Sequence, residues 1–229
     1  MVDVYPMDTA VLWTEDEEGN DYPLYDYLAV FVTPKSDAVQ ELLAIAKEYA
    51  VDEYGSYSEY DLYRSLPGYQ CGDCTEEEWE VYTALQVMAI YNALKYYYGV
   101  SYLNMPTAFG VEKDFVQRIN LPEESLRLGS ANCIDGAVLF ASALEAIGIQ
   151  PFIVIVPGHA FVAWSINPGG EKTVALETTM IGEYDFEDAY IKGNQELAEY
   201  WDALTDDNYE NGALIDVMEM HEQGILPIR

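Results

Sequence analysis

Cys133 is the residue of this sequence best placed to act as a nucleophile. It opens residues 133–147, whose apolar spacing predicts a helix that ends at Gly148. A thiolate in the first turn of a helix faces unpaired backbone N–H groups and the positive end of the helix dipole, which favour the ionised form. The residues behind it are almost all small and apolar, so we expect a buried helix that holds the sulfur rigidly. The position favours attack by a thiolate on an acyl carbon.

A thiol nucleophile needs a base, and the chain has only two histidines. His159 begins an apolar run directly after the turn formed by Pro157 and Gly158. Glu177 lies near the end of the next such run, and residues opposite each other on antiparallel strands are about 5 Å apart. Glu177 could therefore accept a hydrogen bond from the imidazole and fix its tautomer. The sequence predicts a triad of Cys133, His159 and Glu177.

Helices and strands must bring these three side chains together. Short turns join three β-rich runs, at 151–156, 159–166 and 173–178, which predicts neighbouring antiparallel strands. A helix over Phe186–Leu204 and an edge strand at 214–217 should follow. We expect the helix that carries Cys133 to pack on this sheet.

The first half of the chain predicts more helix than strand. Residues 10–14 and 27–33 are expected to form strands, the second being rich in β-branched and aromatic residues. A helix should run from a cap at Ser36 or Asp37 to about residue 50. A second should follow the capping box that begins at Thr75 and cover 76–98. Residues 100–129 should be loop and short helix.

These elements predict one domain over residues 1–229. Its expected parts are N-terminal strands at 1–33, a helical region at 34–128, a catalytic core at 129–180, and a C-terminal helix with an edge strand at 181–229.

The order of cysteine, histidine and carboxylate resembles that of the transglutaminase-like superfamily, in its microbial cysteine peptidase branch. The resemblance covers roughly residues 117–179. It is most specific in NCID at 132–135, LEAIGI at 144–149, PGHAF at 157–161 and LETT at 176–179. It implies an α+β fold with a papain/transglutaminase-like core, in which the Cys-bearing helix packs on an antiparallel β-sheet.

The resemblance also implies a cysteine-dependent acyl hydrolase or transferase, a peptidase or amidase that works through a thioester acyl-enzyme. The oxyanion would be held by the backbone N–H of Cys133 and a second donor, for which Gln117, Asn120 and Asn132 are candidates. The superfamily often has glycine where this chain has Ala131, and aspartate where it has Glu177. Water or an amine could accept the acyl group, and the sequence leaves both open.

A second hypothesis is a catalytically inactive domain of the same fold, used for binding or as a surface or assembly module. A single cysteine is more often a small buried hydrophobe than a nucleophile. Asp135 could be a second catalytic carboxylate, although its place in the first helical turn also suits stabilisation by the helix dipole.

Cys71 and Cys74 form a C-x-x-C pair with three interpretations: a structural disulfide, two plain thiols, or half of a zinc site. The chain has only three cysteines and so no second pair, and a disulfide or plain thiols are favoured over metal. We expect no cofactor and no metal.

The net charge of −31 limits the classes of partner. It argues against nucleic acid, whose binding needs clustered Lys and Arg. We expect a protein or peptide substrate and, without an apolar run of about 18 residues, no membrane insertion. No signal peptide is visible, and an extracellular or cell-surface protein that has lost its leader is favoured over a cytoplasmic one. The acidity fits salt adaptation or an acidic surface protein, and the oligomeric state is left open.

Overall fold

A computed structural model describes residues 6–15, 18–50, 64–103, 114–170, 172–205 and 212–228. The fold is α+β with mainly antiparallel sheets, in agreement with the predicted class. Its centre is a four-stranded antiparallel sheet in the order β8-β7-β6-β9. The strands are β6 (Pro151–Val156), β7 (His159–Ser165), β8 (Thr173–Leu176) and β9 (Ala213–Asp216). All four predicted strands of this sheet are therefore confirmed.

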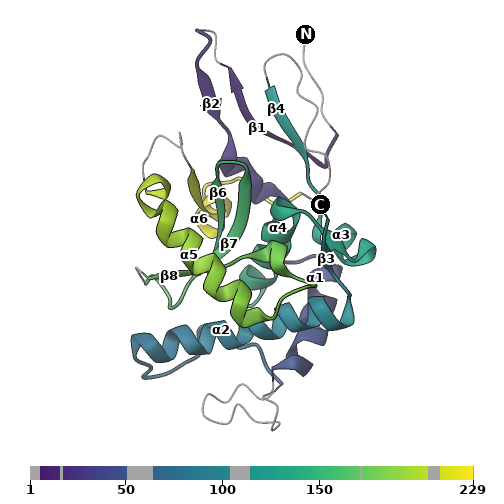
Figure 1. The fold of residues 1–229 in the computed structure, drawn as a ribbon, viewed down its shortest axis with the longest axis vertical. Helices are drawn as coiled ribbons and strands as arrows, with labels where there is room; N and C mark the ends of the chain where they lie inside the picture. The colour runs from purple at the N-terminus through teal and green to yellow at the C-terminus, as the bar shows by residue number, and fades with distance from the viewer. Residues whose placement is uncertain are drawn as a thin grey trace.

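Two helices cover the opposite faces of this sheet, α4 (Cys133–Ala146) and α5 (Phe186–Leu204). Successive side chains of a strand point to opposite faces. Val162 and Trp164 accordingly belong to the same core as the apolar residues of α4, whereas Phe161 and Ala163 pack with Leu197 of α5. In Figure 1, β6 and β7 lie between the two helices. Both helices agree with their predicted spans.

Helices from the first half of the chain pack around α4. The helix α1 (Asp37–Ala46) begins at Ser36, whose side chain accepts a hydrogen bond from the N–H of Val39. The helix α2 (Glu76–Asn92) has the predicted capping box at Thr75 and continues as a π-helix over Ala93–Tyr97. Two further α-helices are short: α3 (Pro122–Leu128), and α6 (Val217–Glu222) near the C-terminus.

A second sheet, in the order β2-β1-β4, projects from this body at the top of Figure 1. Its strands are β1 (Thr9–Glu15), β2 (Asp21–Pro23) and β4 (Asp114–Arg118). A short parallel pair joins β3 (Ser101–Tyr102) to β5 (Ser130–Ala131). Because β3 and β4 lie within residues 100–129, the expectation of only loop and short helix there is wrong.

The strand predicted at 27–33 is also wrong, because a 3-10 helix occupies Tyr25–Phe31. Leu28, Ala29, Phe31 and Val32 are all buried, so the run has no alternation of buried and exposed positions. A short, wholly apolar run fits a buried strand and a buried helical turn equally well. The packing around it decides the outcome, and Val32 donates its N–H to the carbonyl of Ala29.

Gly193 lets α5 lie directly against the end of β8. A Cβ at this position would come within 2.7 Å of the backbone of Leu176 and of the nitrogen of Glu177. We expect Gly193→Ala to push α5 away and to lower the free energy of unfolding by about 1–3 kcal/mol, as overpacked cores do. Urea denaturation measures this change. The exposed neighbour Gln195, replaced by alanine, should change it by less than about 0.5 kcal/mol. A Gly193→Ala protein as stable as the wild type would contradict this close approach.

Candidate functional site

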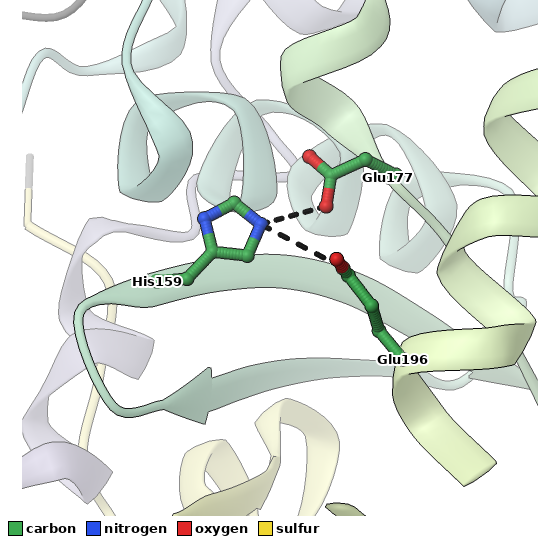
Figure 2. A group of neighbouring side chains, drawn as sticks. All are labelled: His159, Glu177 and Glu196. Atoms are coloured by element: carbon green, nitrogen blue, oxygen red, sulfur yellow. Dashed lines mark hydrogen bonds and ion pairs between the residues drawn. The ribbon is translucent and has the colours of Figure 1, made fainter. Parts of the chain in front are cut away.

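His159 and Glu177 form a short hydrogen bond at one end of the central sheet. The imidazole Nε2 lies 2.6 Å from Oε2 of Glu177, as Figure 2 shows. Val162 of β7 pairs with Leu176 of β8, so Glu177 comes directly after the last paired residue of β8. The predicted contact between the histidine and the carboxylate is present.

The second oxygen of the Glu177 carboxylate is also held. Thr179 donates both its N–H, at 2.8 Å, and its hydroxyl, at 2.5 Å, to Oε1. The Glu177 residue is only 3% exposed. A buried carboxylate with hydrogen bonds on both oxygens has little freedom to turn, so it fixes the orientation of His159.

Cys133 lies at the N-terminal end of α4, half-buried and as a free thiol. Glu177 occupies Nε2 of His159, and Figure 2 shows the other ring nitrogen on the opposite side of the ring. Cys133 contributes to the raised pKa of His159, so the thiol lies within electrostatic range of the imidazole. The direct hydrogen bond of the imidazole is with Glu177, at 2.6 Å.

The charges of the site favour a protonated imidazole. Burial alone would lower the pKa of His159, but interactions with Cys133 and Glu177, including their negative charge, raise it to about 10. Burial alone would raise the pKa of Glu177, but hydrogen bonds with His159 and neighbouring groups hold it well below its usual range. The site therefore favours an imidazolium beside an ionised Glu177 carboxylate.

These two shifts predict how the stability of the fold depends on pH. The raised pKa of His159 stabilises the fold fully below 6.5, its ordinary value, and this contribution is lost as the pH rises toward about 10. The lowered pKa of Glu177 stabilises fully above its ordinary value of 4.5 and is lost as the pH falls further. The free energy of unfolding lost in Glu177→Gln should therefore be greatest between pH 4.5 and 6.5.

Urea titrations of both proteins at pH 5.5 and 9 test this dependence. The loss caused by Glu177→Gln should be smaller at pH 9, because the wild-type contribution of His159 has by then declined. Glu199→Gln, which changes an exposed carboxylate of α5, should show no such pH dependence. A Glu177→Gln loss that is equal at the two pH values would contradict the assigned charges.

Glu196 of α5 is a third member of this group that the sequence analysis missed. Its Oε2 lies 3.8 Å from Nε2 of His159, and Lys192, one turn earlier, binds its Oε1 at 2.8 Å. One ligand atom from each of His159, Glu177 and Glu196 lies within 4.8 Å of the others, so these three could hold a metal ion. The i,i+4 pairing of lysine and glutamate is a sequence signal for a helix surface, and it gives no indication of a site.

Asn132 and Asp135 form a capping box that begins α4 next to Cys133. The side-chain oxygen of Asn132 accepts a hydrogen bond from the N–H of Asp135, and the Asp135 carboxylate accepts one from the N–H of Asn132. Asp135 is 1% exposed and also binds the backbone and side-chain nitrogens of Asn120. Asp135 thus anchors the start of α4, in line with the helix-dipole interpretation.

The oxyanion candidates differ in what their side chains already do. Asn120 donates its amide to Asp135, at 3.0 Å. Asn132 uses its side-chain oxygen for the cap, which leaves its amide nitrogen as a possible donor. Gln117 lies buried on β4, where it pairs with Ala10 of β1. Asn132 therefore precedes Cys133 directly in the chain and still has a side-chain amide that can donate.

Tyr102 of β3 is a further residue that the sequence did not single out. Burial and the negative charges of Cys133 and Glu177 raise the pKa of its hydroxyl. Its neighbour in the parallel pair is Ala131, two residues before Cys133. Tyr102 is 41% exposed, so an accessible tyrosine lies on the strand that pairs next to the start of α4.

The remaining two cysteines and the second histidine lie elsewhere. Cys71 and Cys74 are joined as a disulfide, one of the expected interpretations of the C-x-x-C pair. Nδ1 of His221 lies 2.8 Å from Oε1 of Glu145, and Nε2 donates to the carbonyl of Ala29 at 2.9 Å. Both Glu145 and His221 line a cavity of about 890 Å³ that includes none of the triad residues.

Similarity to known proteins does not identify this site. No family model matches the chain, and no curated protein or solved structure is significantly similar to it. Within the described residues, no helix is long and apolar enough to cross a membrane. A function for the chain is therefore argued from its own side chains.

Proposed function

We propose that the protein is a cysteine-dependent acyl hydrolase or acyltransferase, a peptidase or amidase with a transglutaminase-like core. Cys133 is the nucleophile, His159 the base and Glu177 the residue that orients the base. One observation carries this proposal: His159 forms a hydrogen bond with Glu177 through Nε2 at 2.6 Å, and Cys133 helps to raise the pKa of the same imidazole. Three distant segments supply these groups, as a nucleophile, base and orienting group require.

Acylation begins with a proton transfer from the thiol of Cys133 to His159. The thiolate then forms a bond to the acyl carbon, and the carbonyl electron pair moves to oxygen. The N–H of Cys133 stabilises this oxyanion, together with a second donor such as the amide of Asn132 or Gln117. When the carbon–nitrogen bond breaks, the imidazolium gives its proton to the leaving amine, and a thioester remains on the sulfur.

Deacylation uses the same groups in the reverse order. His159 takes a proton from water, or from an acceptor amine, as that nucleophile forms a bond to the thioester carbon. The carbon–sulfur bond breaks and the sulfur of Cys133 leaves as a thiolate, beside the imidazolium that now holds the proton. Glu177 remains ionised throughout and stabilises the imidazolium in both halves of the reaction.

Protein or peptide is the proposed substrate class. Cys133 is half-buried rather than enclosed, and exposed Tyr102 and Leu103 come from the segment that pairs beside it. A thiol bordered by exposed apolar side chains can accept part of a large substrate while the rest stays outside the protein. The net charge of −31 would favour substrates with basic groups near the acyl carbon.

A small activated ester tests the proposal without knowledge of the substrate. We expect p-nitrophenyl acetate to release one equivalent of nitrophenolate rapidly at pH 7 and to leave an acetyl group on Cys133. Mass spectrometry of the acid-quenched, digested protein locates the acetyl group. Acetylation confined to lysine side chains, with an unmodified Cys133 peptide, would refute the cysteine mechanism and favour a non-catalytic module.

A further inference from the structure

Glu196 is buried against the proposed catalytic pair. Its side chain is 16% exposed, and Oε2 lies 3.8 Å from Nε2 of His159. Among the described residues this oxygen has no hydrogen-bond partner within bonding distance, although it is fully buried. Lys192, on the solvent side of α5, binds the other oxygen, Oε1, at 2.8 Å. The carboxyl group is thus fixed in place with one oxygen directed at His159 and Glu177 (Figure 2).

Two carboxyl groups beside one imidazole repel each other when both are ionised, which costs electrostatic free energy. Glu177 and Glu196 reach the same ring nitrogen, at 2.6 Å and 3.8 Å. Like charges this close in a buried site oppose each other, and one carboxyl group keeps its proton as a result. Glu177 receives two hydrogen bonds from Thr179 in addition to that from His159, so it is the group that ionises.

The other charges that face Glu196 act in both directions. Lys192 on the same helix favours its ionised form and so opposes this division, but burial and the adjacent Glu177 favour its protonated form. His159 on β7 is the cation shared with Glu177. Cys133 on α4 acts electrostatically on His159, and Tyr102 on β3 interacts with Cys133 and Glu177.

We infer that Glu196 is a positioning residue that keeps its proton and donates it toward the Glu177 carboxylate. This hydrogen bond holds Glu177 and His159 in the orientation that the reaction at Cys133 requires. This inference rests on the proposed function. The pKa values agree with it in direction. Burial and the adjacent Glu177 raise the pKa of Glu196, and interaction with Glu196 contributes to the lowered pKa of Glu177.

Glutamine and alanine at this position distinguish a proton donor from an anion. Glutamine keeps a neutral donor of almost the same shape, so Glu196→Gln should behave like the wild type. Alanine removes the donor, and the pKa of Glu177 should rise in Glu196→Ala. As the pH is lowered, the rate at which iodoacetamide alkylates Cys133 should therefore begin to fall at a higher pH in Glu196→Ala than in the wild type. We expect this acidic midpoint to shift by about one pH unit, the effect of one hydrogen bond.

A second measurement does not depend on the thiol. In a Cys133→Ala background, the ¹⁵N chemical shift of Nε2 of His159 should report protonation of Glu177 with the same midpoint shift in Glu196→Ala and none in Glu196→Gln. Glu199→Ala, on the exposed side of the same helix, is the matched control and should leave both midpoints unchanged.

Each other pattern overturns the inference. Equal impairment by glutamine and alanine would show that the Glu196 anion matters, and a further change of the ¹⁵N shift on adding Zn²⁺ to the wild type would identify a metal site instead. Midpoints unchanged in both variants would show that Glu196 positions nothing. Failure of the proposed function would give a different result. Cys133 of the wild type would then not be alkylated preferentially at pH 6, whereas the ¹⁵N measurement in the Cys133→Ala background would still test the role of Glu196 independently.

Discussion

Alanine in place of Cys133 should abolish turnover of every ester or amide substrate that the wild-type protein cleaves. Acyl transfer needs the sulfur for bond formation, and no neighbouring group replaces it. Loss of the nucleophile from a triad lowers kcat by a factor on the order of 10³ or more. Nitrophenolate release under multiple-turnover conditions, followed spectrophotometrically, measures this loss.

Two matched variants separate catalysis from folding in this experiment. Replacing Cys71 and Cys74 together with serine removes the disulfide but should leave the rate per folded molecule unchanged, because neither residue is in the site. Cys133→Ser keeps a nucleophile of similar size, yet its hydroxyl ionises far less readily than a thiol, so its rate should stay close to that of the alanine variant. Persistent turnover in Cys133→Ala would place the chemistry on another residue.

Local signals were sufficient to predict the elements that carry the triad. Gly148 and the apolar spacing before it mark the end of α4, and Thr75 with Glu78 forms the predicted capping box of α2. The strands β6, β7 and β8 are apolar runs separated by short turns that contain Pro157 and Pro168. Such signals are contained within a few residues, so a single sequence reveals them.

Two elements that depend on distant parts of the chain were not predicted. The strand β4 forms because Val11 and Thr14 of β1 pair with Val116 and Asp114, about a hundred positions away in the chain. The 3-10 helix at Tyr25–Phe31 resembles a strand in composition, and its packing against the core selects the helical turn. A partner far away in sequence leaves no local trace in either segment.

The same division applies to the site. His159 and Glu177 could be predicted because each comes at a turn or strand end where neighbouring strands meet. Thr179 and Glu196 could not, because their roles depend on how the chain after β8 turns and where α5 then lies. Glu196 is one of 41 acidic residues and is paired with Lys192 in a pattern typical of exposed helices. Only the packing of Gly193 against β8 brings this face of α5 to the triad.

Asparagine in place of His159 should convert Cys133 from an activated thiolate into an ordinary thiol. In the proposed mechanism the imidazolium stabilises the thiolate, and the raised pKa of His159, about 10, keeps the imidazole protonated near neutral pH. In the wild type, the rate at which iodoacetamide alkylates Cys133 should therefore change little between pH 6 and 9. An ordinary thiol, with a pKa of about 8.5, is less than about 1% ionised at pH 6. Alkylation of Cys133 in His159→Asn should accordingly be about 100-fold slower at pH 6 and should approach the wild-type rate near pH 9.

The other histidine supplies the control for this prediction. His221→Asn removes a partly buried imidazole of the same chain, paired with Glu145 at the opposite end of α4, and should leave the alkylation profile unchanged. Rates are followed by mass spectrometry on the Cys133 peptide, with circular dichroism confirming that both variants are folded. A wild-type profile that already rises steeply with pH would mean that His159 does not activate the sulfur, because an ion pair present below pH 10 removes that dependence. A flat profile in His159→Asn would instead assign the activation to groups other than His159. The N-terminus of α4 alone typically contributes about 1 kcal/mol, which is less than one pKa unit. The difference between the two profiles therefore measures how much of the reactivity of Cys133 comes from the histidine.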